Sequence, residues 1–238
     1  MINSVEWLDQ KFFPAYTNNW DDQMFRERIV PYLSDSVTVL DLGAGAGNVR
    51  QMNFKGLSAR VCGVDLDPRV LQNPYLDEGK IGTGEAVPYP DCSFDVVFAD
   101  NVLEHLCRPQ KVFDEIYRVL KRGGVFLAKT PNKFHYMPWI SRSTPLSFHK
   151  WVNRLRGRHE EDTFPTFYLV NSAGDFRRTC AQSGLTPELV EFHEGRPEYL
   201  RMTLFTYVFG LLYQRIVQST DALQYFRIVM IGVARKPE

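Results

Sequence analysis

The stretch that most constrains this chain is residues 37–48, V-T-V-L-D-L-G-A-G-A-G-N. Its first half is apolar and β-branched, which is typical of a buried parallel strand. The strand stops at three alternating glycines, Gly43, Gly45 and Gly47, which let the backbone turn sharply and let a ligand lie against the main chain. We expect a helix from about Asn48, whose N-terminal N–H groups would point at the same place. The stretch therefore predicts a ligand-binding strand–turn–helix unit.

Two classes of cofactor use such a unit, and a tight turn without a ligand is the structural alternative. Dinucleotides require G-x-G-x-x-G, but here the third glycine comes too early and Asn48 stands in its place. Asp41, two residues before the first glycine, would repel a pyrophosphate and suits a ligand with a positive charge or an ammonium group. A dinucleotide is therefore the weaker interpretation.

The next strand ends add groups to the same edge of the predicted sheet. Residues 59–64 predict a second strand that ends at Asp65, about 20 residues past the glycine turn, where a carboxylate can accept hydrogen bonds from both ribose hydroxyls. Residues 94–99 predict the fourth strand, after which Asn101 and Val102 lie beside the cofactor. These features indicate a cofactor that contains a nucleoside.

Two later runs extend the pattern: residues 84–95, G-E-A-V-P-Y-P-D-C-S-F-D, and residues 120–128, L-K-R-G-G-V-F-L-A. With residues 37–48 they resemble, in order, the motifs of class I S-adenosylmethionine-dependent methyltransferases, in the small-molecule branch that contains the ubiquinone and menaquinone enzymes. The resemblance covers residues 37–132. It implies S-adenosyl-L-methionine as the cofactor and a Rossmann-like α/β fold, with a seven-stranded, mostly parallel sheet and helices on both faces.

The resemblance also implies roles for single residues. The glycine turn would hold the methionine end of the cofactor, with Asp41 near its amino group. Glu85 would accept a hydrogen bond from the adenine amino group, the Ala86 backbone would lie near the ring, and Leu66 would lie against its face. The run N-P-Y at residues 73–75 is close to an amine-methylation signature of the family but follows the wrong strand, so we interpret it as a turn. The expected cofactor residues are Asp41, Gly43, Ala44, Gly45, Gly47, Asp65, Leu66, Glu85, Ala86, Asn101 and Val102.

Histidines supply the candidate catalytic groups. His105, in the loop after the fourth strand, could take a proton from a substrate hydroxyl during methyl transfer, or could only hydrogen-bond the loop. Residues 133–171 are an insertion relative to the family pattern, and we expect a lid there with two further candidate bases, His135 and His149. The aromatic and histidine side chains of this insertion suit a ring-bearing or polyhydroxylated acceptor, and its arginines suit a phosphate or carboxylate on that acceptor. The spacing of histidines and acids predicts no metal site.

The chain is expected to form one methyltransferase domain over residues 1–238, with a helical lead-in at 1–36 and an apolar helical insertion at 196–220, between the last two strands. The segment 199–218 is too short and too interrupted by arginines to be a confident membrane span. Packing on the lid is our first expectation for it, and a homodimer contact or a seat on a membrane surface are the alternatives.

Composition limits the function. Lysine plus arginine equals aspartate plus glutamate at 28 each, and a net charge of zero argues against a nucleic-acid partner. Scattered cysteines and an N-terminus without a signal pattern favour a cytoplasmic protein, or one peripheral to a membrane. We therefore expect methyl transfer to oxygen of a small-molecule, glycan-like or lipid-linked acceptor. Carbon methylation of a quinone-like ring and a non-catalytic, cofactor-binding partner subunit are the alternatives.

Overall fold

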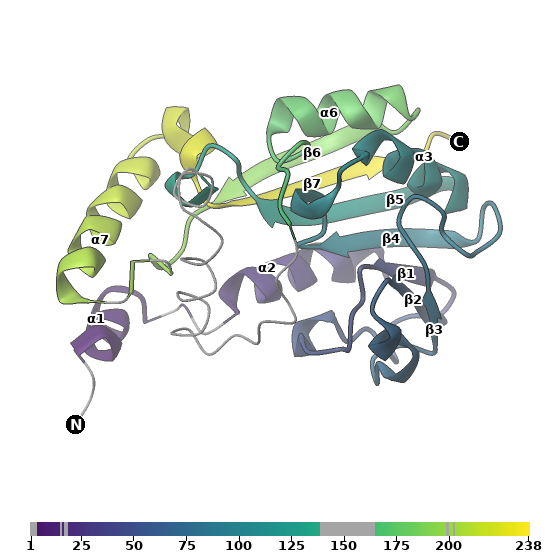
Figure 1. The fold of residues 1–238 in the computed structure, drawn as a ribbon, viewed down its shortest axis with the longest axis horizontal. Helices are drawn as coiled ribbons and strands as arrows, with labels where there is room; N and C mark the ends of the chain where they lie inside the picture. Colours follow the sequence, from purple (N-terminus) through teal and green to yellow (C-terminus); the bar gives the residue numbers. More distant parts are fainter. Residues whose placement is uncertain (1–3, 15, 17–18, 139–164, 199, 202) are drawn as a thin grey trace. The chain divides into compact units, whose positions relative to one another are not determined.

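The computed structural model describes residues 4–14, 16, 19–138, 165–198, 200–201 and 203–238, which fall into two compact units (Figure 1). The first unit comprises Met1–Trp20, Pro131–Thr166 and Phe192–Val229. The second comprises Asp21–Thr130, Phe167–Glu191 and Met230–Glu238.

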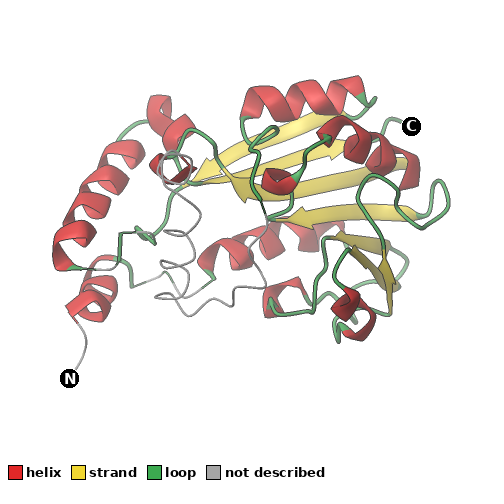
Figure 2. Cartoon of the chain, in the orientation of Figure 1, coloured by secondary structure: helices red, strands yellow, loops and turns green. Residues whose placement is uncertain are grey.

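Seven strands form one sheet in the order β3-β2-β1-β4-β5-β7-β6 (Figure 2). They are β1 (Thr38–Leu42), β2 (Arg60–Asp65), β3 (Glu78–Ile81), β4 (Phe94–Asp100), β5 (Leu120–Pro131), β6 (Thr186–His193) and β7 (Val229–Arg235). The neighbours from β3 to β5 pair in parallel, whereas Figure 1 shows β7 running against the other strands. The expected Rossmann-like, mostly parallel sheet is confirmed, and its switch in strand order places the ends of β1 and β4 side by side.

Helices cover both faces of this sheet. They are α2 (Trp20–Ile29), α3 (Pro109–Val119) and α6 (Ala173–Gln182). Phe98 of β4 packs edge-on against Phe25 of α2, with ring centroids 6.3 Å apart, and Phe126 of β5 packs against Phe113 of α3 at 5.4 Å. Because Phe126 pairs with Val97, the neighbour of Phe98, the two strand rings point to opposite faces.

The prediction of a helix from about Asn48 is wrong. Only a short 3-10 turn, Arg50–Met52, follows the glycine turn. The Arg26 guanidinium of α2 donates to the carbonyls of Gln51 and Asn53 at 2.7 and 2.6 Å, and these bonds stabilise the non-helical conformation of this segment. Gly56 then turns the chain with a φ of 79°.

The strand β5 begins directly after α3, which ends at Val119, so residues 121–124 belong to the strand. Lys121 donates to the Asp95 carboxylate at 2.7 Å, and the backbone of residues 123–124 exchanges hydrogen bonds with Lys236. These contacts hold residues 121–124 in the sheet.

The first unit contains α1 (Ser4–Phe12) and α7 (Leu204–Gln218). Leu8 and Phe13 pack against Tyr207 of α7, and the Tyr207 hydroxyl donates to Asp9 at 2.9 Å. None of the helices in the described part of the chain is long and apolar enough to cross a membrane. The lid predicted at 133–171 lies largely outside the described residues, since 139–164 are not among them.

Candidate cofactor-binding site

All three glycines of the turn after β1 adopt a positive φ, at 87° for Gly43, 52° for Gly45 and 76° for Gly47. The N–H groups of Gly43 and Ala44 donate to the Val64 carbonyl of β2, at 2.8 and 3.3 Å. A Cβ on Gly43 would lie 2.4 Å from Cγ2 of Val102, so the loop after β4 packs directly on the turn. Glycine is therefore required at position 43 by both conformation and space.

Asn73 supports the same turn from the other side. Its buried amide donates to the carbonyls of Ala44 and Gly45, at 2.9 and 3.3 Å, and its Oδ1 accepts from the Tyr75 N–H at 2.9 Å. A Cβ on Gly47 would lie 2.4 Å from this Oδ1. The sequence predicts a turn at residues 73–75 but gives no sign that the side chain reaches back some thirty positions to the glycines.

Asp65 joins the ends of β1 and β2. Its Oδ2 accepts from the Gly45 N–H and its Oδ1 from the Asp67 N–H, both at 2.8 Å. Each oxygen keeps a lone pair for a further donor, such as a hydroxyl of a sugar. Leu66, the next residue, is exposed, as an apolar contact for a ring would require.

Asp41 is a buried carboxylate that accepts no hydrogen bond from any residue that the structure describes. Burial raises its pKa well above the usual range, and the nearby carboxylates of Asp100 and Asp65 raise it further. A cationic group placed beside these acids would relieve their repulsion. This edge of the sheet is thus suited to a positively charged ligand and unsuited to a pyrophosphate.

A buried lysine balances part of this negative charge. Lys129 of β5 is fully buried, and its Nζ lies 2.9 Å from carboxylate oxygens of both Asp21 and Asp100 and also donates to Asp22. Burial alone would lower the pKa of Lys129, but the three carboxylates outweigh it and keep the amine charged. For Asp100, burial and the neighbouring acids raise the pKa, which Lys129 lowers. Sequence reasoning missed this cluster, because α2 and β5 lie more than a hundred residues apart.

The loop after β4 contains three of the expected residues. Asn101 has a φ of 54°, its N–H donates to the Lys129 carbonyl at 2.9 Å, and its side-chain amide donates to Asp100 at 3.0 Å. His105 follows in a 3-10 turn, Leu103–His105, with 32% of its side chain exposed. The described loop therefore brings Val102 against the glycines and leaves an accessible imidazole three residues further on.

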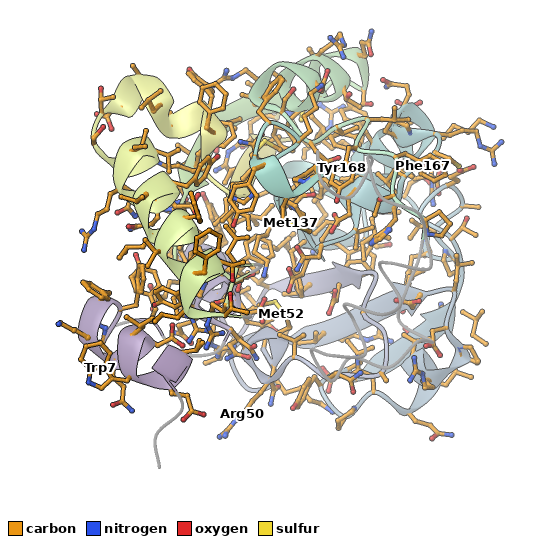
Figure 3. The ribbon with its side chains drawn as sticks, turned by 60° about the vertical axis from the view of Figure 1, so that its left-hand side comes forward. Trp7, Arg50, Met52, Met137, Phe167 and Tyr168 are labelled. Carbon is orange, nitrogen blue, oxygen red and sulfur yellow. The ribbon has the colours of Figure 1, made fainter. Side chains whose placement is uncertain are left out.

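Glu104 fixes the position of this turn through its side chain and its carbonyl. Its buried carboxylate accepts from the Thr130 hydroxyl at 2.8 Å and lies 4.0 Å from Nε2 of His105. Its carbonyl accepts the N–H groups of Phe167 and Tyr168, at 2.7 and 3.2 Å, and Figure 3 shows these two residues together. Burial raises the pKa of Glu104, and His105 lowers it. The backbone that carries His105 is thus held by β5 and by the segment before α6.

Other expected residues have partners or places that the sequence does not indicate. Glu85 forms an ion pair with Arg108, whose Nε donates to Oε1 at 3.0 Å, and the Ala86 N–H donates to the Thr83 carbonyl at 3.2 Å. His135 belongs to the first unit and is fully buried, and burial lowers its pKa to about 3, so it is a poor proton acceptor at neutral pH. His149 lies outside the described residues.

Comparison with known proteins identifies the fold and its chemistry. A family model described as a methyltransferase domain matches residues 40–128, which include the end of β1, the glycine turn, β2 and β4. A probable S-adenosylmethionine-dependent methyltransferase of Mycolicibacterium smegmatis is 37% identical over 117 residues, which cover 47% of this chain and 44% of the relative, less than half of its length. The ubiquinone/menaquinone biosynthesis C-methyltransferase UbiE of Hydrogenovibrio crunogenus is 37% identical over 177 residues, with coverage of 69% and 68%.

The chain belongs to the class I S-adenosylmethionine-dependent methyltransferases. A solved complex of the Trm112 methyltransferase activator with a methyltransferase of Haloferax volcanii has the same fold as this methyltransferase, with a TM-score of 0.60 at 18% identity and coverage of 97% and 96%. The resemblance read from residues 37–132 is thereby confirmed.

The second unit of this methyltransferase fits the cofactor of its family. S-adenosylmethionine has a cationic sulfonium, an ammonium group and a ribose. The unpartnered Asp41 carboxylate and the acids Asp65 and Asp100 suit the two positive charges, and Asp65 also offers acceptors to a ribose. The positive-φ glycines let the main chain approach a ligand closely.

Proposed function

We propose that this methyltransferase transfers the methyl group of S-adenosylmethionine to an oxygen atom of a small-molecule acceptor, at the edge formed by the ends of β1, β2 and β4. The observation that carries the proposal is the unpaired, buried Asp41 carboxylate between two further acids and beside a glycine turn. We assign Asp41, Asp65 and the glycine turn to the cofactor. Leu66 and Val102 line the same edge.

His105 is the proposed base. When bound, S-adenosylmethionine supplies an electrophilic methyl group, so the protein mainly has to align the acceptor and remove its proton. His105 is part-exposed on the loop that contacts the glycine turn through Val102, whereas His135 is buried and holds its proton weakly. Glu104, 4.0 Å away, would stabilise the imidazolium that forms when His105 takes the proton.

Glu85 and Ala86, which we assign to the adenine, already have hydrogen-bond partners within the protein. For Glu85 to accept from an adenine amino group, it must keep a lone pair free beside Arg108, which its bidentate capacity allows. The Ala86 N–H already has an acceptor in Thr83, so we assign only its position near the ring.

The test begins with titration calorimetry of the wild type and Asp65→Ala with S-adenosylmethionine, with NAD as the control ligand. We expect binding of the methyl donor, no binding of NAD, and a loss of at least about tenfold in affinity for the variant, because two or more charge-assisted hydrogen bonds are lost. An unchanged affinity of Asp65→Ala for S-adenosylmethionine would exclude Asp65 as a cofactor-binding residue.

Turnover is then measured with carbon-13-labelled methyl donor and a panel of phenols, sugars and quinols. We expect methyl ethers, and we expect His105→Gln to lower kcat by about a hundredfold or more and to remove the acidic limb of the pH profile. A His105 variant with normal kcat and pH profile would exclude the base role.

Carbon methylation is the second candidate, and one observation favours it: the Hydrogenovibrio crunogenus relative is named a C-methyltransferase. The carbon-13 chemical shift of the product separates a ring methyl from a methyl ether. Cofactor binding without turnover on any acceptor would instead favour a non-catalytic partner subunit.

A further inference from the structure

Helix α7 has its apolar side chains on the outside. Its exposed side chains recur at helical spacing and are all large and apolar along most of its length, with exposed fractions from 46% to 73%. We call this set the α7 face; it consists of Leu204, Phe205, Val208, Phe209, Leu212 and Ile216. The buried side of the same helix contains the polar residue Gln214 and the Tyr207 hydroxyl group. This is the reverse of the pattern expected for a helix that only covers a core.

The contacts of the inner side fix this orientation. Tyr207 is fully buried and donates to Asp9 of α1, and a Cβ on Gly210 would lie 2.3 Å from the Pro197 side chain. Thr203 and Thr206 form a capping box at the start of the helix. Because Tyr207 is bonded to Asp9 and Gly210 packs against Pro197, α7 cannot rotate to bury the α7 face within its own unit.

The two ends of the α7 face carry cations. At the N-terminal end, Figure 3 shows Trp7 on α1 beside α7; this indole is half exposed, and the Lys11 ammonium lies 4.7 Å from its ring centroid. At the C-terminal end, Arg215 is exposed. Neither Lys11 nor Arg215 has a carboxylate partner within the described part of the chain. Asp9 and Glu198, two acids of the same unit, are paired with Arg201.

The size and composition of the α7 face favour one kind of occupant. Six large side chains at about half exposure present on the order of 600 Å², which is at the upper end for a patch on a monomer. Two copies of such a face would bury about 1,200 Å², only the lower limit of a specific interface. Protruding phenylalanines with a neighbouring tryptophan and basic ends are instead typical of helices that lie in a lipid–water interface, which needs no complementary shape.

We propose that the α7 face and Trp7 seat this protein on the surface of an anionic lipid bilayer, with α7 parallel to the membrane plane. At 15 residues α7 is shorter than the roughly 20 needed to span a bilayer. Lys11 and Arg215 would contact lipid phosphates while the apolar side chains enter the boundary with the acyl chains. This inference is independent of the acceptor atom and of the base assigned above.

The experiment is vesicle flotation of the full chain with phosphatidylcholine vesicles, with and without one third of phosphatidylglycerol. The variant Phe205→Ser with Phe209→Ser removes the two aromatic side chains of the α7 face. The matched control, Leu57→Ser with Leu189→Ser, removes two exposed leucines from the second unit. We expect wild type and control to float with anionic vesicles, and the face variant to lose about tenfold or more in partitioning. Changing Lys11 and Arg215 to glutamine should weaken binding only to the anionic vesicles.

A second measurement does not depend on the fold of any face variant. Brominated lipids should quench tryptophan fluorescence of the wild type, and Trp7→Phe should remove part of that quenching. Circular dichroism and titration with S-adenosylmethionine establish that each variant is folded. Wild type that stays off both vesicles, or a face variant that floats like wild type, would overturn the proposal. A dimer in light scattering that the face variant converts to a monomer, without vesicle binding, would assign the face to a second copy instead.

Discussion

Replacing Lys129 by methionine should destabilise the fold far more than replacing an exposed lysine in a comparable ion pair. Lys129 is fully buried, and Asp21, Asp22 and Asp100 share its single ammonium group. Methionine nearly preserves the volume but leaves three carboxylates without a cation. Removing one partner of a buried ion cluster costs about 3–5 kcal/mol. With a urea m-value of roughly 2–3 kcal/mol/M, the midpoint should fall by about 1–2.5 M.

The control is Lys121→Met. Lys121 donates to Asp95 at the same kind of distance, 2.7 Å, but 40% of its side chain is exposed. Because solvent screens such a pair, its loss should cost at most about 1 kcal/mol. Both variants are unfolded with urea and followed by circular dichroism, beside the wild type.

The pH dependence gives a second, independent readout. Without Lys129, the pKa of the buried Asp100 should rise further, because burial and the neighbouring acids are no longer opposed. Between the ordinary carboxyl pKa and this raised value the folded state binds more protons than the unfolded state, so stability falls as pH rises through that window. The deficit of Lys129→Met should therefore be larger at pH 8 than at pH 5, and adding Asp100→Asn should recover part of it.

Two results would refute this reasoning. One is a Lys129→Met variant that unfolds within about 1 kcal/mol of wild type, like the Lys121 control. The other is a deficit that grows as the pH is lowered, because protonation should relieve the unbalanced acids.

Three shorter predictions concern the glycine turn and its neighbours. Gly43→Ala should cost about 1–3 kcal/mol more than Gly56→Ala in urea unfolding, since both have a positive φ but only the Cβ at position 43 would clash, with Val102; equal costs would contradict this. Asn73→Ala should weaken S-adenosylmethionine binding about tenfold in calorimetry, through loss of hydrogen bonds that hold the turn, and unchanged affinity would be contrary evidence. Cofactor affinity should rise with pH as Asp41 ionises through its raised pKa, and Asp41→Asn should flatten that dependence; a wild-type affinity that is flat from pH 5 to pH 9 would count against it.

The parts of this structure that sequence reasoning predicted are those set by local patterns. The apolar runs before Gly43 and before Asp65 mark strand ends, and alternation and glycine content are visible within a few residues. The prediction of a helix after the glycine turn failed for a non-local reason: Arg26, in a helix further upstream, donates to the carbonyls of Gln51 and Asn53 and stabilises another conformation there. Lys129 and Asn73 were missed for the same reason, because each meets its partners only after the sheet has formed.

The sequence predicted which strand ends carry the candidate site, but not the hydrogen bonds and ion pairs among its side chains. Asp41, Asp65 and Val102 meet at one sheet edge because parallel strands end together. The partners of Glu85 and Glu104 depend on side-chain packing between separate loops, for which a single sequence has no pattern. The roles of these residues toward the cofactor stay predictions.

In the proposed site, the acidic edge would also affect the release of product. Methyl transfer converts a sulfonium into a neutral thioether, so the spent cofactor has one positive charge fewer than the incoming one. Asp41, Asp65 and Asp100 would then attract the two molecules unequally, although both keep the same ribose and amino acid groups. An enzyme with this charge arrangement would release the spent cofactor more readily and would be less inhibited by it as it accumulates.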